Sequence, residues 1–260
     1  SQPAAKFDVA PSYHSESIVG ALQKSSTAIT VNTKFSREVQ VEITRDDISR
    51  QLLESEKHLN HIDDFFLHTS EPGLLSEGAW DFLQGAKRDG RIRRIGFAGD
   101  GQQLSKARAD FRFEVFQSTF SIVDQGNFGI LRAIESEGRG LQLKRVLGSG
   151  LLSKRPLARI RNAIAPTSPY SYRYRLERLE SHLKSFGQLL VRDFIQFVTE
   201  AFPEADLVVG VSDAEGLREI QRELTQLVYG SPSIIRRLDC SQVIDLWSSL
   251  FSGTPAEIPE

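Results

Sequence analysis

The 260-residue sequence contains no methionine and one cysteine, Cys240. A single cysteine excludes an internal disulfide framework and is typical of a reducing compartment. No apolar run approaches the roughly 18 residues of a membrane span, and residues 1–6 do not resemble a signal peptide. We therefore expect a cytoplasmic protein with no membrane partner. Because even an initiator methionine is missing, either the chain is a processed or excerpted piece, or methionine positions have dropped out of its sequence.

The chain also lacks an excess of charge of either sign. It carries 32 Lys and Arg against 34 Asp and Glu, a formal net charge of -2, so we expect no nucleic acid partner. There is no GxGxxG motif, which leaves a Rossmann nucleotide site unsupported. A metal site is also disfavoured, since its best candidates straddle a predicted helix–strand junction. These candidates are His58, His61, Asp63 and Asp64.

Short buried runs rich in β-branched and aromatic residues alternate with amphipathic stretches along the whole chain, which indicates a parallel sheet covered by helices. Seven βα units are visible, with strands near residues 7, 31, 65, 96, 115, 143 and 208. A closed (β/α)8 TIM barrel has eight. The eighth unit would precede Phe7, so either the barrel closes unusually or its first strand and helix are missing. We predict one α/β barrel domain over residues 1–260, either incomplete at its N-terminus or unusually closed, with a tail over 221–260.

Ionisable residues follow the first three of these strands. Asp8 and Tyr13 lie on either side of a turn at Pro11–Ser12, Lys34 ends the run 27–33, and His68 ends the run 62–67. In an α/β barrel the C-terminal ends of the strands carry the chemistry. Taken singly, each residue is more often a structural or surface residue than a catalytic one. Their shared position at strand ends makes them a candidate site.

At these residues the sequence resembles the aldo-keto reductases. The matching stretches occur in the family's order and cover most of the chain. They are FDVAPSYHSESIVGAL (7–22), VNTK (31–34), HIDDFFLH (61–68), GRIRRIGFAG (90–99), VFQ (115–117), LGSGLL (147–152) and VVGVSDAEGLREI (208–220). The resemblance implies a barrel fold, reduction of a carbonyl group by a nicotinamide cofactor, and a catalytic tetrad of Asp8, Tyr13, Lys34 and His68.

The chemistry accounts for these four residue types. Hydride addition to a carbonyl carbon leaves charge on the oxygen, which needs a proton donor and a stabilising dipole. The resemblance implies that Tyr13 is the general acid. An ammonium about 4 Å away, that of Lys34, stabilises the phenolate by about 4 kcal/mol at an effective dielectric constant of roughly 20. Asp8 would fix Lys34, and His68 would orient the substrate carbonyl.

The resemblance implies NADP as the cofactor, with NAD as the alternative. Its expected contacts are Gln117, Lys144, Leu147, Ser149, Gly210 and Ser212. Several positions depart from the family pattern. Ala98 and Gly99 replace a Ser-Asn pair that grips the nicotinamide carboxamide, and Gly210 and Gly216 replace the basic residues that commonly hold the 2′-phosphate. His14 replaces the glycine that usually follows the catalytic tyrosine.

We therefore predict an NAD(P)H-dependent reductase of a small aldehyde or ketone. The alternative from another class is a barrel of the same family acting as a binding or regulatory subunit with little or no turnover. The filled tetrad favours the enzyme, and the altered cofactor positions favour the alternative. A sugar isomerase would need a metal or phosphate site that the sequence does not offer. The substrate and the oligomeric state stay open, because the loop 154–174 and the tail match no pattern.

Overall fold

The computed structural model describes residues 5–26, 28–37, 41–69, 71–122, 124–148, 152, 191–211 and 214–225. The chain divides into two compact units, 1–118 with 133–141, and 119–132 with 142–260. Several predictions lie outside the described residues. They concern Ser149, Ser212, the loop 154–174 and the part of the tail from residue 226 onward.

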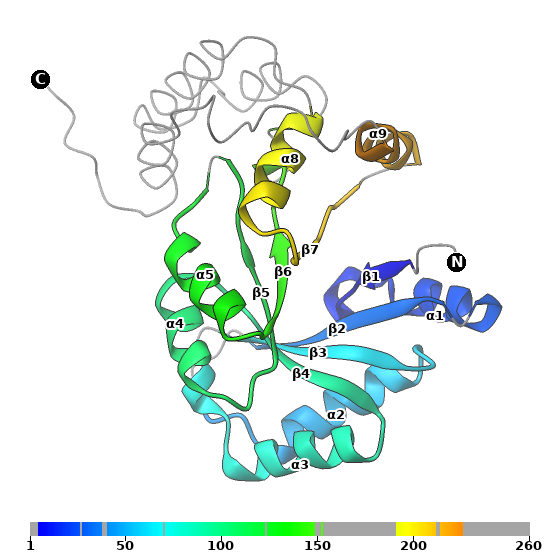
Figure 1. Cartoon of the computed structure of the whole chain (residues 1–260). Coiled ribbons are helices and arrows are strands. Elements are labelled where there is room, and N and C mark those ends of the chain that lie inside the picture. Colours follow the sequence, from blue (N-terminus) through cyan, green and yellow to red (C-terminus); the bar gives the residue numbers. More distant parts are fainter. Residues whose placement is uncertain are drawn as a thin grey trace, which may run out of the picture. The chain divides into compact units, whose positions relative to one another are not determined.

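The first unit contains a parallel sheet whose strands follow one another in chain order (Figure 1). Its strands are β1 (Lys6–Asp8), β2 (Thr30–Arg37), β3 (Ile62–Thr69), β4 (Ile92–Ala98) and β5 (Val115–Thr119). The register places Asp8 beside Asn32 and Lys34 beside Phe66. Because side chains alternate between the two faces of a strand, this register decides which polar residues share a face.

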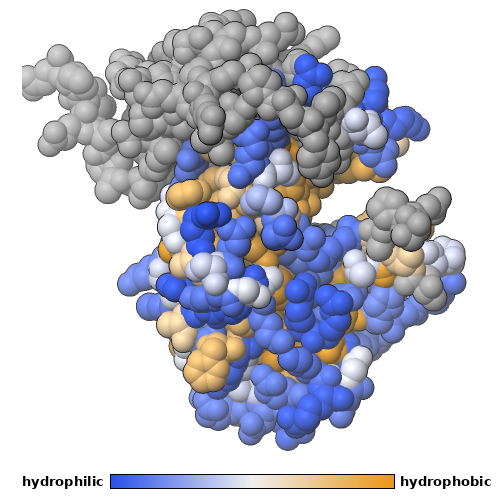
Figure 2. Space-filling view, viewed as in Figure 1, coloured by the Kyte–Doolittle hydropathy of each residue, from blue (hydrophilic) through white to orange (hydrophobic). Residues whose placement is uncertain are grey.

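Helices connect these strands. They are α1 (Glu16–Ser25), α2 (Arg45–Glu56), α3 (Glu77–Arg88) and α4 (Gly101–Ala109), with 3-10 turns at Pro11–Tyr13 and Pro72–Leu74. Thr44 and Asp47 form a capping box at the start of α2, as their spacing predicts, and Ser76 caps α3. In Figure 1, α2 and α3 lie side by side, and they pack against β2 and β4 respectively. The visible surface over these two helices is mostly hydrophilic (Figure 2).

An aromatic cluster fills the space between α3 and the sheet. The ring of Phe113 makes edge contacts with Trp80, Phe97 and Phe116 at centroid distances of 5.0, 5.6 and 6.2 Å. All four side chains are buried. Edge-to-face aromatic packing adds to the free energy of burial and fixes the rings in one arrangement. The cluster therefore holds β4 and β5, which carry Ala98 and Gln117, against the helical layer.

The second unit contains the pair β6 (Gly140–Lys144) and β7 (Asp206–Leu207), which run parallel; the first two residues of β6 belong to the first unit. Its helices are α8 (Val191–Ala201) and α9 (Ala214–Thr225), and α5 (Phe128–Ser136) spans both units. The strand predicted near residue 143 ends at Lys144, because Arg145 adopts a positive φ of 57°, which an extended strand cannot contain.

The seven strands thus alternate with helices in chain order, β1 to β7. This confirms the predicted α/β class with seven visible βα units, one short of a (β/α)8 barrel. No helix in the described parts of the chain is long and apolar enough to cross a membrane. Within the same residues, no group of three or more His, Cys, Asp or Glu side chains is arranged to hold a metal ion.

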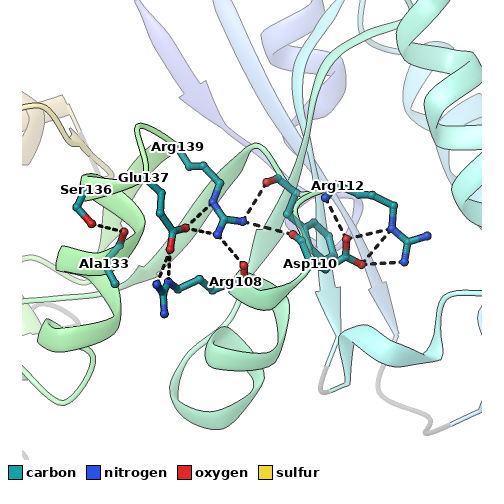
Figure 3. A network of polar contacts seen from close by, with 8 residues as sticks. Arg108, Asp110, Arg112, Ala133, Ser136, Glu137 and Arg139 are labelled. Atoms are coloured by element: carbon teal, nitrogen blue, oxygen red, sulfur yellow. Dashed lines mark hydrogen bonds and ion pairs between the residues drawn. The ribbon is translucent and has the colours of Figure 1, made fainter.

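A network of charged side chains ties the loop before β6 to the end of α4 (Figure 3). The Arg139 guanidinium donates to the backbone carbonyls of Arg108 and Asp110 at 2.6 and 3.3 Å, and also to the Glu137 carboxylate. The Arg108 side chain donates to the same carboxylate at 2.8 Å. Glu137 therefore sits between two guanidinium groups.

These contacts predict an acid-dependent contribution to stability. Burial alone would raise the pKa of Glu137, but hydrogen bonds from Arg139 and Arg108 outweigh it and hold the pKa below its ordinary value. A carboxylate with a lowered folded-state pKa stabilises the fold at neutral pH, and this contribution is lost as the pH falls through that pKa. We expect Glu137→Gln to destabilise the protein by about 1 kcal/mol at pH 7.

The measurement is the thermal midpoint of the wild type and of Glu137→Gln across a pH series. The difference between the two proteins should shrink toward zero in acid. A difference of constant size at all pH values would show that the charge of Glu137 contributes nothing. Glu135→Gln is the control, because Glu135 lies in α5 two residues before Glu137 and is not part of the network drawn in Figure 3.

Candidate active site

The centre of the candidate site is an ion pair between the first two strands. Lys34 Nζ lies 2.6 Å from Asp8 Oδ2, and the side chains are 3% and 16% exposed. Asp8 is the last residue of β1, and Lys34 lies within β2, which continues to Arg37 rather than ending at Lys34 as predicted. Lys34 Nζ also contacts the backbone carbonyl of Val9 at 3.4 Å. A buried ammonium is stable only with such partners.

Tyr13 is brought to this pair by the 3-10 turn Pro11–Tyr13. Its backbone N–H donates to the carbonyl of Ala10, and Lys34 Nζ lies 5.5 Å from the centroid of its ring. Tyr13 as a residue is 57% exposed, so a ligand can approach it from solvent. The turn ends at His14, whose φ of 54° is left-handed. This conformation explains why glycine is favoured after the tyrosine, since glycine adopts it without strain.

His68 stands on the same face of the sheet as Lys34. The register pairs Ser36 with His68 and Lys34 with Phe66, and residues two apart on a strand share a face. His68 is exposed, and its Nδ1 lies 3.5 Å from the Ser36 hydroxyl. The structure thus brings Asp8, Tyr13 and Lys34 into contact range and places His68 beside them. The four residues converge from three separate segments.

A buried contact that sequence reasoning missed supports the site from beneath. The Thr33 hydroxyl donates to Glu16 Oε1 at 2.6 Å, and both residues are buried. Thr33 immediately precedes Lys34, and Glu16 opens α1 three residues after Tyr13. The bond therefore joins the segment that carries the tyrosine to the strand that carries the lysine. The signal available in the sequence was an acidic residue in the first turn of a helix at a position that faces the core.

Removal of that hydroxyl should destabilise the fold. Thr33→Val keeps the shape of the side chain but leaves the Glu16 carboxylate without this donor, so we expect a loss of about 1–3 kcal/mol. Thr33→Ser retains the hydroxyl and should cost less than Thr33→Val. Urea denaturation measures both variants. If Thr33→Val and Thr33→Ser are equally stable, the hydrogen bond to Glu16 does not support the site.

The expected cofactor contacts are only partly retained in the described residues. Ala98 is buried against Phe66 and Val115, so an apolar cluster stands where the family carries a polar side chain. At Gly99 an added Cβ would lie 2.6 Å from the ring of Phe97, which excludes the family's asparagine without rearrangement. Gln117 is present and buried, and its Nε2 donates to Asp8 Oδ1 at 2.9 Å.

The remaining cofactor positions belong to the second unit. Lys144 is the half-buried last residue of β6, and its backbone carbonyl accepts from Phe120 N–H at 3.2 Å. The Leu147 side chain is buried, so contact with a ligand would involve its backbone rather than its side chain. Gly210 follows β7, and among the described residues no atom lies within 4 Å of the position that a Cβ would occupy there.

The parallel α/β sheet of the first unit thus carries a lysine–aspartate pair, with a tyrosine beside it in the turn after β1. Residues 5–224 match the family model described as the aldo/keto reductase family. The chain belongs to this family, as its motifs predict. A search of the curated proteins finds no match.

Solved structures of aldo-keto reductases share the fold. The holo form of AKR11C1 from Bacillus halodurans superposes with a TM-score of 0.68 at 18% identity, covering 94% of this chain and 82% of that one. The glycerol dehydrogenase AKR11B4 from Gluconobacter oxydans superposes with a TM-score of 0.65 at 16% identity, covering 98% of this chain and 84% of that one. The thermostable aldo-keto reductase Tm1743, in complex with the inhibitor epalrestat, superposes with a TM-score of 0.61 at 19% identity, covering 94% of this chain and 81% of that one. At these identities the likeness shows the fold.

Proposed function

We propose that the protein reduces a small aldehyde or ketone to an alcohol with NAD(P)H, and that Tyr13 is the general acid. The observation that carries the proposal is the Lys34 ammonium, which is buried, bonded to Asp8 at 2.6 Å, and 5.5 Å from the centre of the Tyr13 ring. A cation held in this way stabilises the tyrosinate that remains after proton transfer. The 57% exposure of Tyr13 as a residue supports the approach of a substrate to it.

Each residue of the site then has a defined task. The His68 imidazole donates a hydrogen bond to the carbonyl oxygen and orients it. The Tyr13 hydroxyl transfers its proton to the same oxygen as negative charge develops there. Lys34 stabilises the resulting phenolate, and Asp8 keeps Lys34 in place. Solvent returns the proton to Tyr13 after the alcohol leaves.

The bound nicotinamide supplies the hydride for this reaction. Tyr13, Lys34 and His68 fit the ring of such a cofactor, because they lie on the face where the hydride would be transferred. Fewer side chains are available to bind the carboxamide group, because Ala98 and Gly99 replace the family's polar pair. The residues expected to hold the cofactor are Lys144 and Gly210, together with the backbone at Leu147. Gly210 and Gly216 bring no positive charge toward a 2′-phosphate, so both NADPH and NADH are candidates.

The test is oxidation of NADPH and of NADH, followed by absorbance, in the presence of a panel of reactive aldehydes and ketones. We expect turnover with at least one nicotinamide and a small carbonyl compound. Absence of turnover with every pair would overturn the proposed activity. It would favour the second candidate, a binding or regulatory barrel, for which the apolar Ala98 position and Gly99 are the supporting observations.

A further inference from the structure

Gln117 makes a bond that its expected role does not explain. Its Nε2 donates to Asp8 Oδ1 at 2.9 Å, while the other oxygen of the same carboxylate accepts from Lys34 Nζ at 2.6 Å. Both Asp8 oxygens are thus occupied by nitrogen donors. The Gln117 side chain is buried, with the residue only 2% exposed. A buried glutamine amide with this geometry orients the carboxylate that it contacts.

The position of the two residues in the sheet gives the bond its importance. Asp8 ends β1 and Gln117 lies in β5, so three strands separate them in the sheet order. The bond between them therefore joins strands that are not neighbours in the sheet. β1 has only three residues, and within the described residues its paired strand is β2. Gln117 therefore anchors the end of a short strand that carries Asp8.

The two polar residues that the family places beside the glutamine, to bind the nicotinamide carboxamide with it, are absent at the end of β4. Ala98 has no hydrogen-bonding group and packs against Phe66 and Val115, and Gly99 has no side chain. Gln117 is thus the remaining polar side chain of that set, and its amide nitrogen already bonds to the catalytic pair.

We propose that Gln117 is a positioning residue, which fixes the Asp8 carboxylate and through it Lys34 and Tyr13, rather than a contact that determines cofactor affinity. The expected effects on kcat and KM rest on the proposed function. The expected effect on stability rests only on the Gln117–Asp8 bond. Without Gln117, the Asp8 carboxylate accepts a hydrogen bond from the Lys34 side chain alone. The Lys34 ammonium is then held less firmly beside Tyr13.

The experiment uses Gln117→Leu, Asp8→Asn and the double variant in the full chain. We expect Gln117→Leu to lower kcat about 10- to 100-fold with little change in the KM for NAD(P)H. The basic limb of the pH profile of kcat should move to higher pH, because Lys34 no longer favours the tyrosinate as strongly. In the Asp8→Asn background, Gln117→Leu should have little further effect, since the bond that it removes is already altered.

Binding and stability make the inference independent of turnover. The dissociation constant for NADPH, measured by fluorescence, should change by less than about threefold in Gln117→Leu. The thermal midpoints of the four proteins should be non-additive. Gln23→Leu is the matched control, because Gln23 is a buried glutamine that bonds to His61 and Asn60, so its effect should add independently to that of Asp8→Asn.

Three results would overturn the inference: additive thermal midpoints for Gln117→Leu and Asp8→Asn, a cofactor affinity weakened more than about tenfold with kcat unchanged, or independent multiplication of the two kinetic effects. If the wild type fails to bind or use NAD(P)H, the proposed function fails. The thermal midpoints then still decide whether Gln117 fixes Asp8.

Discussion

Tyr13→Phe lowers kcat for carbonyl reduction by about 1000-fold while the dissociation constant of NADPH stays within about twofold. The variant removes one hydroxyl from a residue that is 57% exposed and leaves the ring beside Lys34. Because the proton transfer depends on that hydroxyl, the loss belongs to the chemical step. Because the ring remains, neither the fold nor cofactor binding should change appreciably.

The measurement combines steady-state kinetics with a fluorescence titration and a thermal scan of the same preparation. An unchanged thermal midpoint shows that the variant is folded, and an unchanged cofactor affinity shows that the site is intact. Equal turnover by the wild type and Tyr13→Phe would remove Tyr13 from the role of general acid. A lost cofactor affinity would instead place the tyrosine in binding.

Lys34→Met has the second large effect, on activity and on stability together. The Lys34 side chain is 3% exposed and its Nζ lies 2.6 Å from Asp8 Oδ2, so its removal leaves a mostly buried carboxylate without its cation. We expect a loss of about 3 kcal/mol in the free energy of unfolding. We also expect kcat to fall at least about 100-fold, because the Tyr13 phenolate loses its stabilising charge.

The double variant Asp8→Asn with Lys34→Met separates the two effects. Since both charges are gone, much of the stability should return, whereas activity should stay as low as in Lys34→Met. Lys57→Met is the control for removal of a lysine, because Lys57 pairs with Glu54 on the surface with the two side chains 66% and 52% exposed. It should change the stability far less than Lys34→Met does, because solvent screens an exposed ion pair. Activity recovered in the double variant would contradict the role of Lys34.

Much of the fold could be predicted from local sequence. The strand-and-helix alternation follows from hydrophobic periodicity, and the helix starts at Thr44 and Ser76 follow from capping residues. The positions where β2 and β6 end were harder to predict. β2 continues to Arg37 because its register with β3 continues, and β6 ends at Lys144 because Arg145 leaves the extended region. The pairing of neighbouring strands and the backbone angle of a single residue depend on the folded structure, so the local sequence does not reveal them.

The site was predictable in its residue types and not in its contacts. The motif order located Asp8, Tyr13, Lys34 and His68, and the structure brings them to one face of the sheet. The Gln117–Asp8 bond joins residues 109 apart in the sequence, so no local pattern indicates it. The bond between Thr33 and Glu16 was missed as well, although Glu16 offered a signal as an acidic residue in the first turn of a helix at a core-facing position.

The central claim is that this face of the sheet serves a nicotinamide cofactor beside Tyr13 and Lys34. The most direct measurement is a titration of the wild-type protein with NADPH and with NADH, followed by cofactor fluorescence. The account predicts saturable binding of at least one of the two at a single site, in the micromolar range that is usual for enzyme ligands, about 1 μM to 1 mM. Absence of saturable binding for both cofactors would contradict it.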